Sequence, residues 1–265
     1  MRKKHKQLLA VALAAAVMLI PHAAAASAAP HIGADASYEE PYGLIFDAAT
    51  GKLHLNISNS DDPADPANLE YTGQTGKWSG APGVLRLDGF VWDTRGEKAL
   101  TVANGTVAIE LSAGSVNRLA SLCASAPLTY GLGNLGGAIV VSGEGELNVT
   151  GGPAVFSSYG AVTNSGIILD GGTLRLKAGE SAVSRGFAGP YITVNKGVLS
   201  AAGDTTAMEL QWLDLPDVYT YWASPDNADP GGAGITYVNG GVPFTVSPNY
   251  KFVKIQSPPA PPAAK

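Results

Sequence analysis

Two short acidic loops carry the side chains best suited to binding a ligand. The first, NSDDPADPAN (59–68), contains Asp61, Asp62 and Asp65, and clustered carboxylate oxygens on a loop are the ligands that Ca²⁺ takes. Their spacing is not that of a regular calcium-binding loop, and acidic loops that contain proline also form plain solvated turns. We therefore expect no required cofactor, with calcium at Asp61, Asp62 and Asp65 as the candidate metal and a solvated turn as its alternative.

The second loop, ASPDNADPGG (223–232), follows Trp222 and contains Asp226, Asn227 and Asp229. An exposed indole ring packs against the C–H surface of a sugar, while carboxylate and amide groups bind the hydroxyls beside it. Trp222, Asp226, Asn227 and Asp229 are therefore the candidate carbohydrate-binding residues. The three loop residues also offer oxygen atoms to calcium, again without regular spacing.

Residues suited to catalysis are few. Past residue 28 the histidines are His31 and His54, and neither lies in a catalytic motif. A glycoside hydrolase needs two carboxylates flanking the scissile bond, and a lyase needs a base that removes a proton. The central carboxylates show no such pattern: Glu144, Glu146, Asp170, Glu180 and Asp204. We predict no catalytic residues and a protein that is not an enzyme; the alternative is a polysaccharide lyase or hydrolase with an unrecognised site.

The phrase YGLGNLGG (130–137) has the Gly-x-Gly-x-x-Gly spacing of a dinucleotide-binding loop. That loop needs a strand before its glycines and a helix after them, so that backbone N–H groups face the pyrophosphate. Here the glycines precede a strand pattern at 139–141, and the Tyr-Gly pair recurs at Tyr159-Gly160. We therefore expect the glycines of 131–137 to turn the chain, and we expect no nucleotide.

The N-terminus reads as a secretory signal peptide. A basic start (Arg2, Lys3, Lys4, Lys6) precedes the apolar run 8–20, and Ala26-Ser27-Ala28 offers a cleavage site. The run is shorter than the ~20 residues that cross a bilayer. Cleavage removes four of the 17 Lys and Arg and none of the 22 Asp and Glu, so the net charge becomes −9. An acidic chain without a basic patch argues against a nucleic-acid partner, and no membrane span is expected after cleavage.

The elements expected to position these residues are short strands. Apolar residues alternate, as at Val107, Ile109 and Leu111, which is the strand period. The pattern also repeats every 22–28 residues, so that Ile139, Ile167 and Ile192 align in one column and Val149, Leu176 and Ala201 in another. Repeats of strands and turns indicate a solenoid, in which equivalent residues stack. A β-sandwich or Greek key is the alternative for so many short strands, but it predicts no constant offset.

Three stretches of the repeat region have a similar sequence pattern: 99–119 (ALTVANGTVAIELSAGSVNRL), 130–152 (YGLGNLGGAIVVSGEGELNVTGG) and 157–179 (SSYGAVTNSGIILDGGTLRLKAG). They resemble successive coils of bacterial cell-surface right-handed β-helix repeat proteins, and 219–255 resembles the segment that follows those coils. A related β-helix family contains calcium and binds carbohydrate. The resemblance thus implies cell-wall or plant polysaccharide as the partner. Its motifs specify coils and caps, and they transfer no catalytic or binding residue.

We predict an all-β protein, a single right-handed parallel β-helix of about five coils with a cap at each end. The expected divisions are a signal peptide (1–28), an N-terminal cap (29–80), the coils (81–204), a C-terminal cap (205–257) and a Pro/Ala-rich tail (258–265). The expected function is non-catalytic polysaccharide binding or adhesion, outside a Gram-positive-type bacterial cell. A structural surface spacer, indicated by the proline-rich tail, is a third hypothesis.

Overall fold

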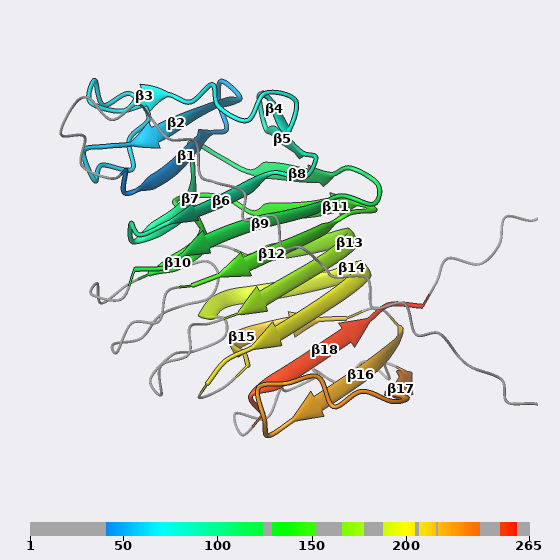
Figure 1. Cartoon of the computed structure of the whole chain (residues 1–265). Coiled ribbons are helices and arrows are strands. Elements are labelled where there is room, and N and C mark those ends of the chain that lie inside the picture. The colour runs from blue at the N-terminus through cyan, green and yellow to red at the C-terminus, as the bar shows by residue number, and fades with distance from the viewer. Residues whose placement is uncertain are drawn as a thin grey trace, which may run out of the picture.

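The computed structural model describes residues 41–123, 129–151, 166–177, 188–204, 207–215, 217–238 and 250–258, with only the backbone at 188–191 and 209–212. The predicted signal peptide and nearly all of the predicted Pro/Ala-rich tail lie outside the described residues. The described chain consists of strands and turns and contains no helix (Figure 1). The all-β prediction is therefore confirmed. Within these ranges, no helix is long and apolar enough to cross a membrane.

Parallel pairing joins most of the strands into three ladders among the described residues. The first ladder contains β5 (Val84–Leu87), β8 (Val107–Leu111), β11 (Ile139–Gly143), the first parts of β13 (Ile167–Lys177) and β14 (Ala188–Ala202), and β15 (Glu209–Asp214). The second contains β6 (Val91–Thr94), β9 (Val116–Ser121), β12 (Glu146–Thr150) and the later parts of β13 and β14. The third contains β1 (Gly43–Asp47), β7 (Lys98–Ala103) and β10 (Tyr130–Asn134).

The two predicted aliphatic columns are present. Ile139 pairs with Ile167, which pairs with Ile192, and all three side chains are fully buried. Val149, Leu176 and Ala201 are paired in the same way in the second ladder and are also buried. Because neighbouring strands lie about 4.8 Å apart, each apolar side chain contacts its equivalents on both sides. This repeated stacking forms the core.

The glycines of YGLGNLGG do not all turn the chain, so that prediction is wrong in part. Gly131 and Gly133 lie inside strand β10, whereas Gly136 and Gly137 lie in the turn before β11. A Cβ on Gly131 would lie 2.5 Å from Cγ1 of Val149. Close packing of strand β10 against β12 therefore requires a residue without a side chain. A strand follows the glycines, as predicted, so no helix N-terminus faces them.

Antiparallel strands lie at both ends of the ladders (Figure 1). At one end, β2 (Lys52–Asn56) pairs with β1 and with β3 (Leu69–Glu70), and β4 (Trp78–Ala81) pairs with β5. At the other end, β18 (Phe252–Gln256) pairs with β14 and with β16 (Val218–Ser224), which pairs with β17 (Ile235–Val238). Tyr219 and Tyr221 of β16 are buried, and both rings contact Tyr237. Aromatic side chains thus lie at this end of the core.

Candidate functional site

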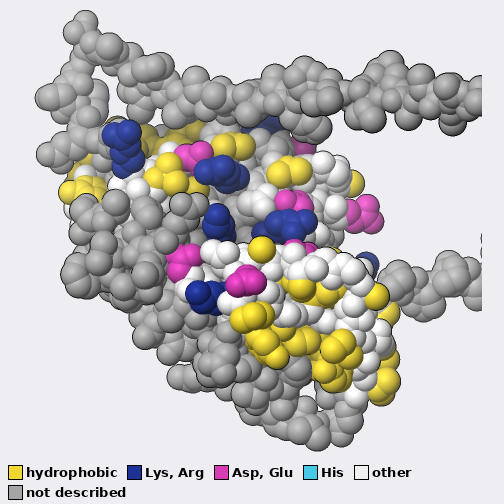
Figure 2. Space-filling model, turned by 60° about the horizontal axis from the view of Figure 1, so that its bottom comes forward, with side chains coloured by type: hydrophobic (Ala, Val, Ile, Leu, Met, Phe, Trp, Pro, Cys, Tyr) yellow, Lys and Arg dark blue, Asp and Glu magenta, His cyan; other side chains and the backbone are white. Residues whose placement is uncertain are grey.

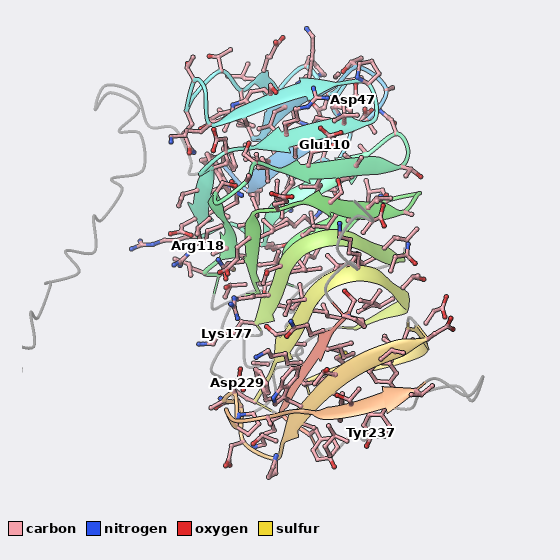
Figure 3. The ribbon with its side chains drawn as sticks, turned by 90° about the vertical axis from the view of Figure 1, so that its right-hand side faces the viewer. Asp47, Glu110, Arg118, Lys177, Asp229 and Tyr237 are labelled. Atoms are coloured by element: carbon pink, nitrogen blue, oxygen red, sulfur yellow. The ribbon has the colours of Figure 1, made fainter. Side chains whose placement is uncertain are left out.

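One row of register-paired residues crosses six neighbouring strands of the second ladder and of the C-terminal strands, and all but the buried Ser200 are at least partly exposed. We call it the polar row; it consists of Arg118, Asn148, Arg175, Ser200, Lys254 and Trp222, each paired in register with the next. Arg118, Lys177 and Asp229 project from the same side of the molecule (Figure 3). Basic and acidic side chains are interspersed on this side, next to hydrophobic side chains that gather toward the β16–β17 end (Figure 2). The row is therefore a polar strip over the sheet, interrupted at the surface by the buried Ser200.

Each basic residue of the polar row is paired with a carboxylate. Nε of Arg118 lies 2.7 Å from Oδ1 of Asp93, and Nε of Arg175 lies 3.1 Å from Oε1 of Glu146. The arginine side chains remain 47% and 49% exposed, so solvent or a ligand reaches both guanidinium groups. Asn148 lies between them and donates 2.9 Å to Oε1 of Glu146. The charged pairs thus present donors and acceptors side by side.

Trp222 ends the polar row and is only partly exposed. Its Nε1 donates 3.1 Å to the carbonyl of Gly232, and the ammonium of Lys254 lies 4.4 Å from the ring centroid. A Cβ on Gly234 would lie 2.4 Å from Cε2 of the indole, so the backbone there packs against the ring. The ring is therefore a fixed, partly exposed wall at the end of the row.

The acidic loop after Trp222 brings one of its three predicted residues to this ring. Oδ2 of Asp229 lies 3.1 Å from Nζ of Lys254, the same ammonium that covers the indole. A backbone hydrogen bond from Gly231, together with Lys254, holds the pKa of Asp229 below its ordinary value. Asn227 instead donates 3.2 Å to Asp204, and Asp226 is an exposed side chain on the loop.

Sequence reasoning did not identify Arg118, Arg175 or Lys254 as site residues. A signal existed for the two arginines, because strand alternation places them outward and the repeat offset aligns them through Asn148. No repeat offset reaches Lys254, since β18 runs antiparallel to β14.

The loop predicted to hold calcium uses its three aspartates for other contacts. Asp61 forms an ion pair of 2.5 Å with Lys98. Asp62 and Asp65 each accept a 2.9 Å hydrogen bond from the backbone N–H two residues later, as in turns that aspartate stabilises. In the part of the chain that the structure describes, no group of three or more His, Cys, Asp or Glu side chains is arranged to hold a metal ion. The geometry favours the solvated-turn alternative, and calcium binding stays a prediction.

The same loop forms one wall of an open groove of about 780 Å³. The opposite walls are the turns Asn104-Gly105 and Leu135-Gly136, the latter from the glycine-rich phrase. Asn104 donates 2.9 Å to the buried carboxylate of Asp47, which fixes one of these turns. The groove thus joins two stretches that the sequence singled out, and of the two aspartates that line it, Asp61 is paired with Lys98.

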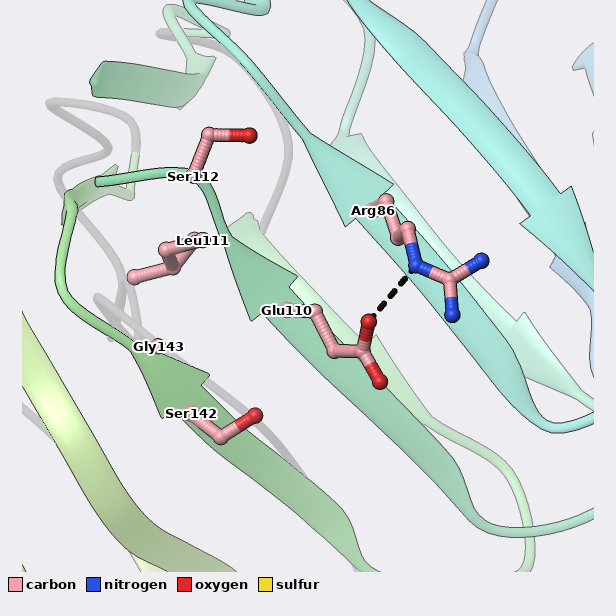
Figure 4. A pocket seen from close by; sticks show the side chains of 6 residues that line it. All are labelled: Arg86, Glu110, Leu111, Ser112, Ser142 and Gly143. Carbon is pink, nitrogen blue, oxygen red and sulfur yellow. Dashed lines mark hydrogen bonds and ion pairs between the residues drawn. The ribbon is translucent and has the colours of Figure 1, made fainter. Parts of the chain in front are cut away.

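A smaller hollow of about 280 Å³ lies on another side of the molecule, over the first ladder (Figure 4). Arg86 and Glu110 line it, and Nε of Arg86 lies 2.7 Å from Oε2 of Glu110. This ion pair has a length similar to those on the polar row, although Arg86 and Glu110 are direct register partners. Glu110 also faces a different direction from Arg118 (Figure 3). The pair therefore provides a control on another side of the molecule.

Comparisons of the chain with family models, with curated proteins and with solved structures gave no match. The functional argument accordingly rests on the geometry of the polar row.

Proposed function

We propose that this chain is a secreted or cell-surface protein that binds polysaccharide without changing it chemically. The observation that carries the proposal is the polar row, in which ion-paired donors and acceptors repeat over a flat sheet and end at Trp222. Sugars offer hydroxyls that both donate and accept, and C–H surfaces that pack on aromatic rings. A strip that combines both kinds of group fits a polymer of sugars.

The proposed fold is a right-handed parallel β-helix with caps at 29–80 and 205–257 around the coils at 81–204. Parallel ladders support it, since strands of successive repeats pair with each other and not with their sequence neighbours, in a register that shifts only at Asp170 among the pairings described for these ladders. Such a fold presents equivalent outward positions at equal spacing, about 4.8 Å apart. A repetitive ligand is therefore matched by a repetitive surface.

The state of the carboxylates on the row supports binding over catalysis. A general acid in glycoside cleavage needs a carboxyl group whose pKa is raised. Glu146 and Asp93 are instead held in ion pairs with arginines, and the pKa of Asp229 is lowered. Each of these carboxylates has a cationic partner and still carries oxygen lone pairs that can accept hydrogen bonds from sugar hydroxyls.

The proposed location is outside a Gram-positive-type bacterial cell, with cell-wall or plant polysaccharide as the ligand. Both proposals follow from the signal-peptide pattern and from the resemblance of 80–255 to cell-surface β-helix repeats. The acidic net charge of the chain after cleavage agrees with a partner other than nucleic acid.

The purified protein should be tested on immobilised cell-wall and plant polysaccharides, once with Ca²⁺ and once with a chelator. We expect retention on at least one polysaccharide, with no reducing or unsaturated ends released. Retention should weaken in Trp222→Ala and persist in Arg86→Ala, the control on another side. Release of new chain ends would favour a lyase or hydrolase and contradict the proposal. Failure to bind any polysaccharide would favour the structural spacer, and loss with chelator alone would assign a role to calcium.

A further inference from the structure

We infer that the polysaccharide is uncharged and lies across the strands, along the polar row from Arg118 to Trp222. This inference rests on the proposed function and deepens it, because it names the class of sugar polymer and the path that the polymer takes.

The balance of charges on the polar row supports an uncharged ligand. Its three basic residues, Arg118, Arg175 and Lys254, are each within 3.1 Å of a carboxylate, from Asp93, Glu146 and Asp229 respectively. A polyanion would have to displace these carboxylates or approach them closely, and like charges at such distances repel. A neutral sugar meets no such repulsion. Its hydroxyls can accept from the guanidinium groups and donate to the carboxylates at the same time.

The spacing of the charged pairs carries the second step. The basic residues occupy every second strand, with Asn148 and Ser200 on the strands between them. At the usual strand separation this places an ion pair about every 10 Å along the row. The cations thus recur at a regular interval along the row, while their carboxylates differ in position: Asp93 is in register with Ala120, Glu146 is in register with Thr173, and Asp229 lies on a loop. A polymer of repeated sugar units would meet a cationic donor at each interval.

The direction of the row carries the third step. A polymer lying along one strand, such as the later part of β13, would meet only Thr173, Arg175 and Lys177 on the outward side. Across the strands it meets the five accessible members of the polar row, with the buried Ser200 between Arg175 and Lys254, over about 24 Å for five strand steps. The partly exposed ring of Trp222, fixed by Gly232 and Lys254, closes that path at one end.

The experiment compares uncharged polysaccharides (glucan, xylan, mannan and galactan) with anionic ones (polygalacturonate, alginate and hyaluronan) by affinity electrophoresis at low and high NaCl. We expect retention by an uncharged polymer that changes little with salt, because no counterions are displaced. Oligosaccharides of that polymer should bind more tightly with length until they span about 24 Å of row. Strongest binding to an anionic polymer, weakened by salt, would overturn this inference and leave polysaccharide binding intact.

Two variants test the path. Arg118→Ala and Arg175→Ala should each weaken binding of the uncharged polymer by about tenfold, a loss typical of one charge-assisted hydrogen bond, and Arg86→Ala should bind like wild type. Circular dichroism and thermal unfolding establish that each variant is folded. Unchanged binding in both row variants would overturn the path while the uncharged class stands. Absence of binding to every polymer would overturn the inference together with the proposed function.

Discussion

The side-chain Oδ1 of Asn117 accepts a 2.9 Å hydrogen bond from the backbone N–H of Phe90, which lies just before the neighbouring strand β6. The amide of the same side chain donates 3.1 Å to the carbonyl of Glu146, on the strand at its other side. Asn117 is fully buried, so it satisfies polar backbone groups that water does not reach. One side chain thus joins three consecutive strands.

Replacing Asn117 with leucine should destabilise the protein by about 1–3 kcal/mol for each buried group left without a partner. The residues paired with this position on the next strands are Leu147 and Leu174, so a leucine fits here in size. The loss in free energy of unfolding therefore measures the missing hydrogen bonds. Urea unfolding gives the measurement. Asn148→Ala, in a partly exposed asparagine one strand away, should cost no more than about 0.5 kcal/mol. Equal losses in the two variants would contradict this role.

The glycine-rich segment YGLGNLGG (130–137) gives a second prediction. Gly131→Ala should destabilise the protein by about 1–3 kcal/mol, because the new Cβ would lie 2.5 Å from Val149 Cγ1 and 2.7 Å from the carbonyl of Thr150. Gly136→Ala is the control from the same phrase, since nothing lies within 4 Å of its Cβ position. The two thermal midpoints should differ, with Gly136→Ala close to wild type. A destabilised Gly136→Ala would show that the turn itself needs glycine.

The stacking of the repeats could be predicted from the sequence because it depends on local periods. Ile139, Ile167 and Ile192 keep a nearly constant offset, and strand alternation shows which side of each strand is buried. The site was predicted less well because its contacts depend on the antiparallel end strands. Nothing in the spacing of Lys254 indicates that it covers Trp222 and pairs with Asp229, since no repeat aligns these residues.

A third prediction concerns acid stability and Asp47. Burial raises the pKa of this carboxyl, but hydrogen bonds from Thr50, Asn104 and the Ala49 N–H more than offset burial, so its pKa in the folded protein lies below the ordinary 3.8. The stabilisation that Asp47 contributes is therefore complete above the pKa that this carboxyl has in the unfolded chain. It is lost as the pH falls through the lower pKa of the folded protein. Asp47→Asn should be less stable than wild type at neutral pH, and the difference should shrink below pH 3.8. Urea midpoints across this range measure it, and a difference independent of pH would contradict the assignment.

A fourth prediction concerns the Lys254 ammonium beside Trp222. Lys254→Met should raise the pKa of Asp229 and shift the indole fluorescence, because the ion pair and the cation over the ring are both lost. The pKa should still remain below its ordinary value, since the largest cause of the lowering is the backbone hydrogen bond from Gly231. Carboxyl NMR titration measures this. An unchanged pKa in the variant would show that Lys254 and Asp229 do not interact in solution.

The last prediction separates pairing from charge on the polar row. Glu146 and Arg175 lie 3.1 Å apart on adjacent strands, with side chains 27% and 49% exposed. Exposed pairs contribute about 0.2–1 kcal/mol to stability, so exchanging their charges should leave the protein folded. Arg175→Glu alone should weaken binding of an uncharged polysaccharide more than Arg175→Ala does, because the guanidinium donor is lost and two carboxylates then face each other.

Adding Glu146→Arg to Arg175→Glu should restore most of that binding, since a donor and an acceptor again lie side by side, although in reversed order. The same exchange of Arg86 and Glu110, which form an equivalent pair on another side, is the control and should change binding in neither the single nor the double variant. Affinity electrophoresis on the uncharged polymer measures all four proteins. If the double exchange is folded and still binds no better than Arg175→Glu, the row recognises its ligand through the arginine itself and not through the pair.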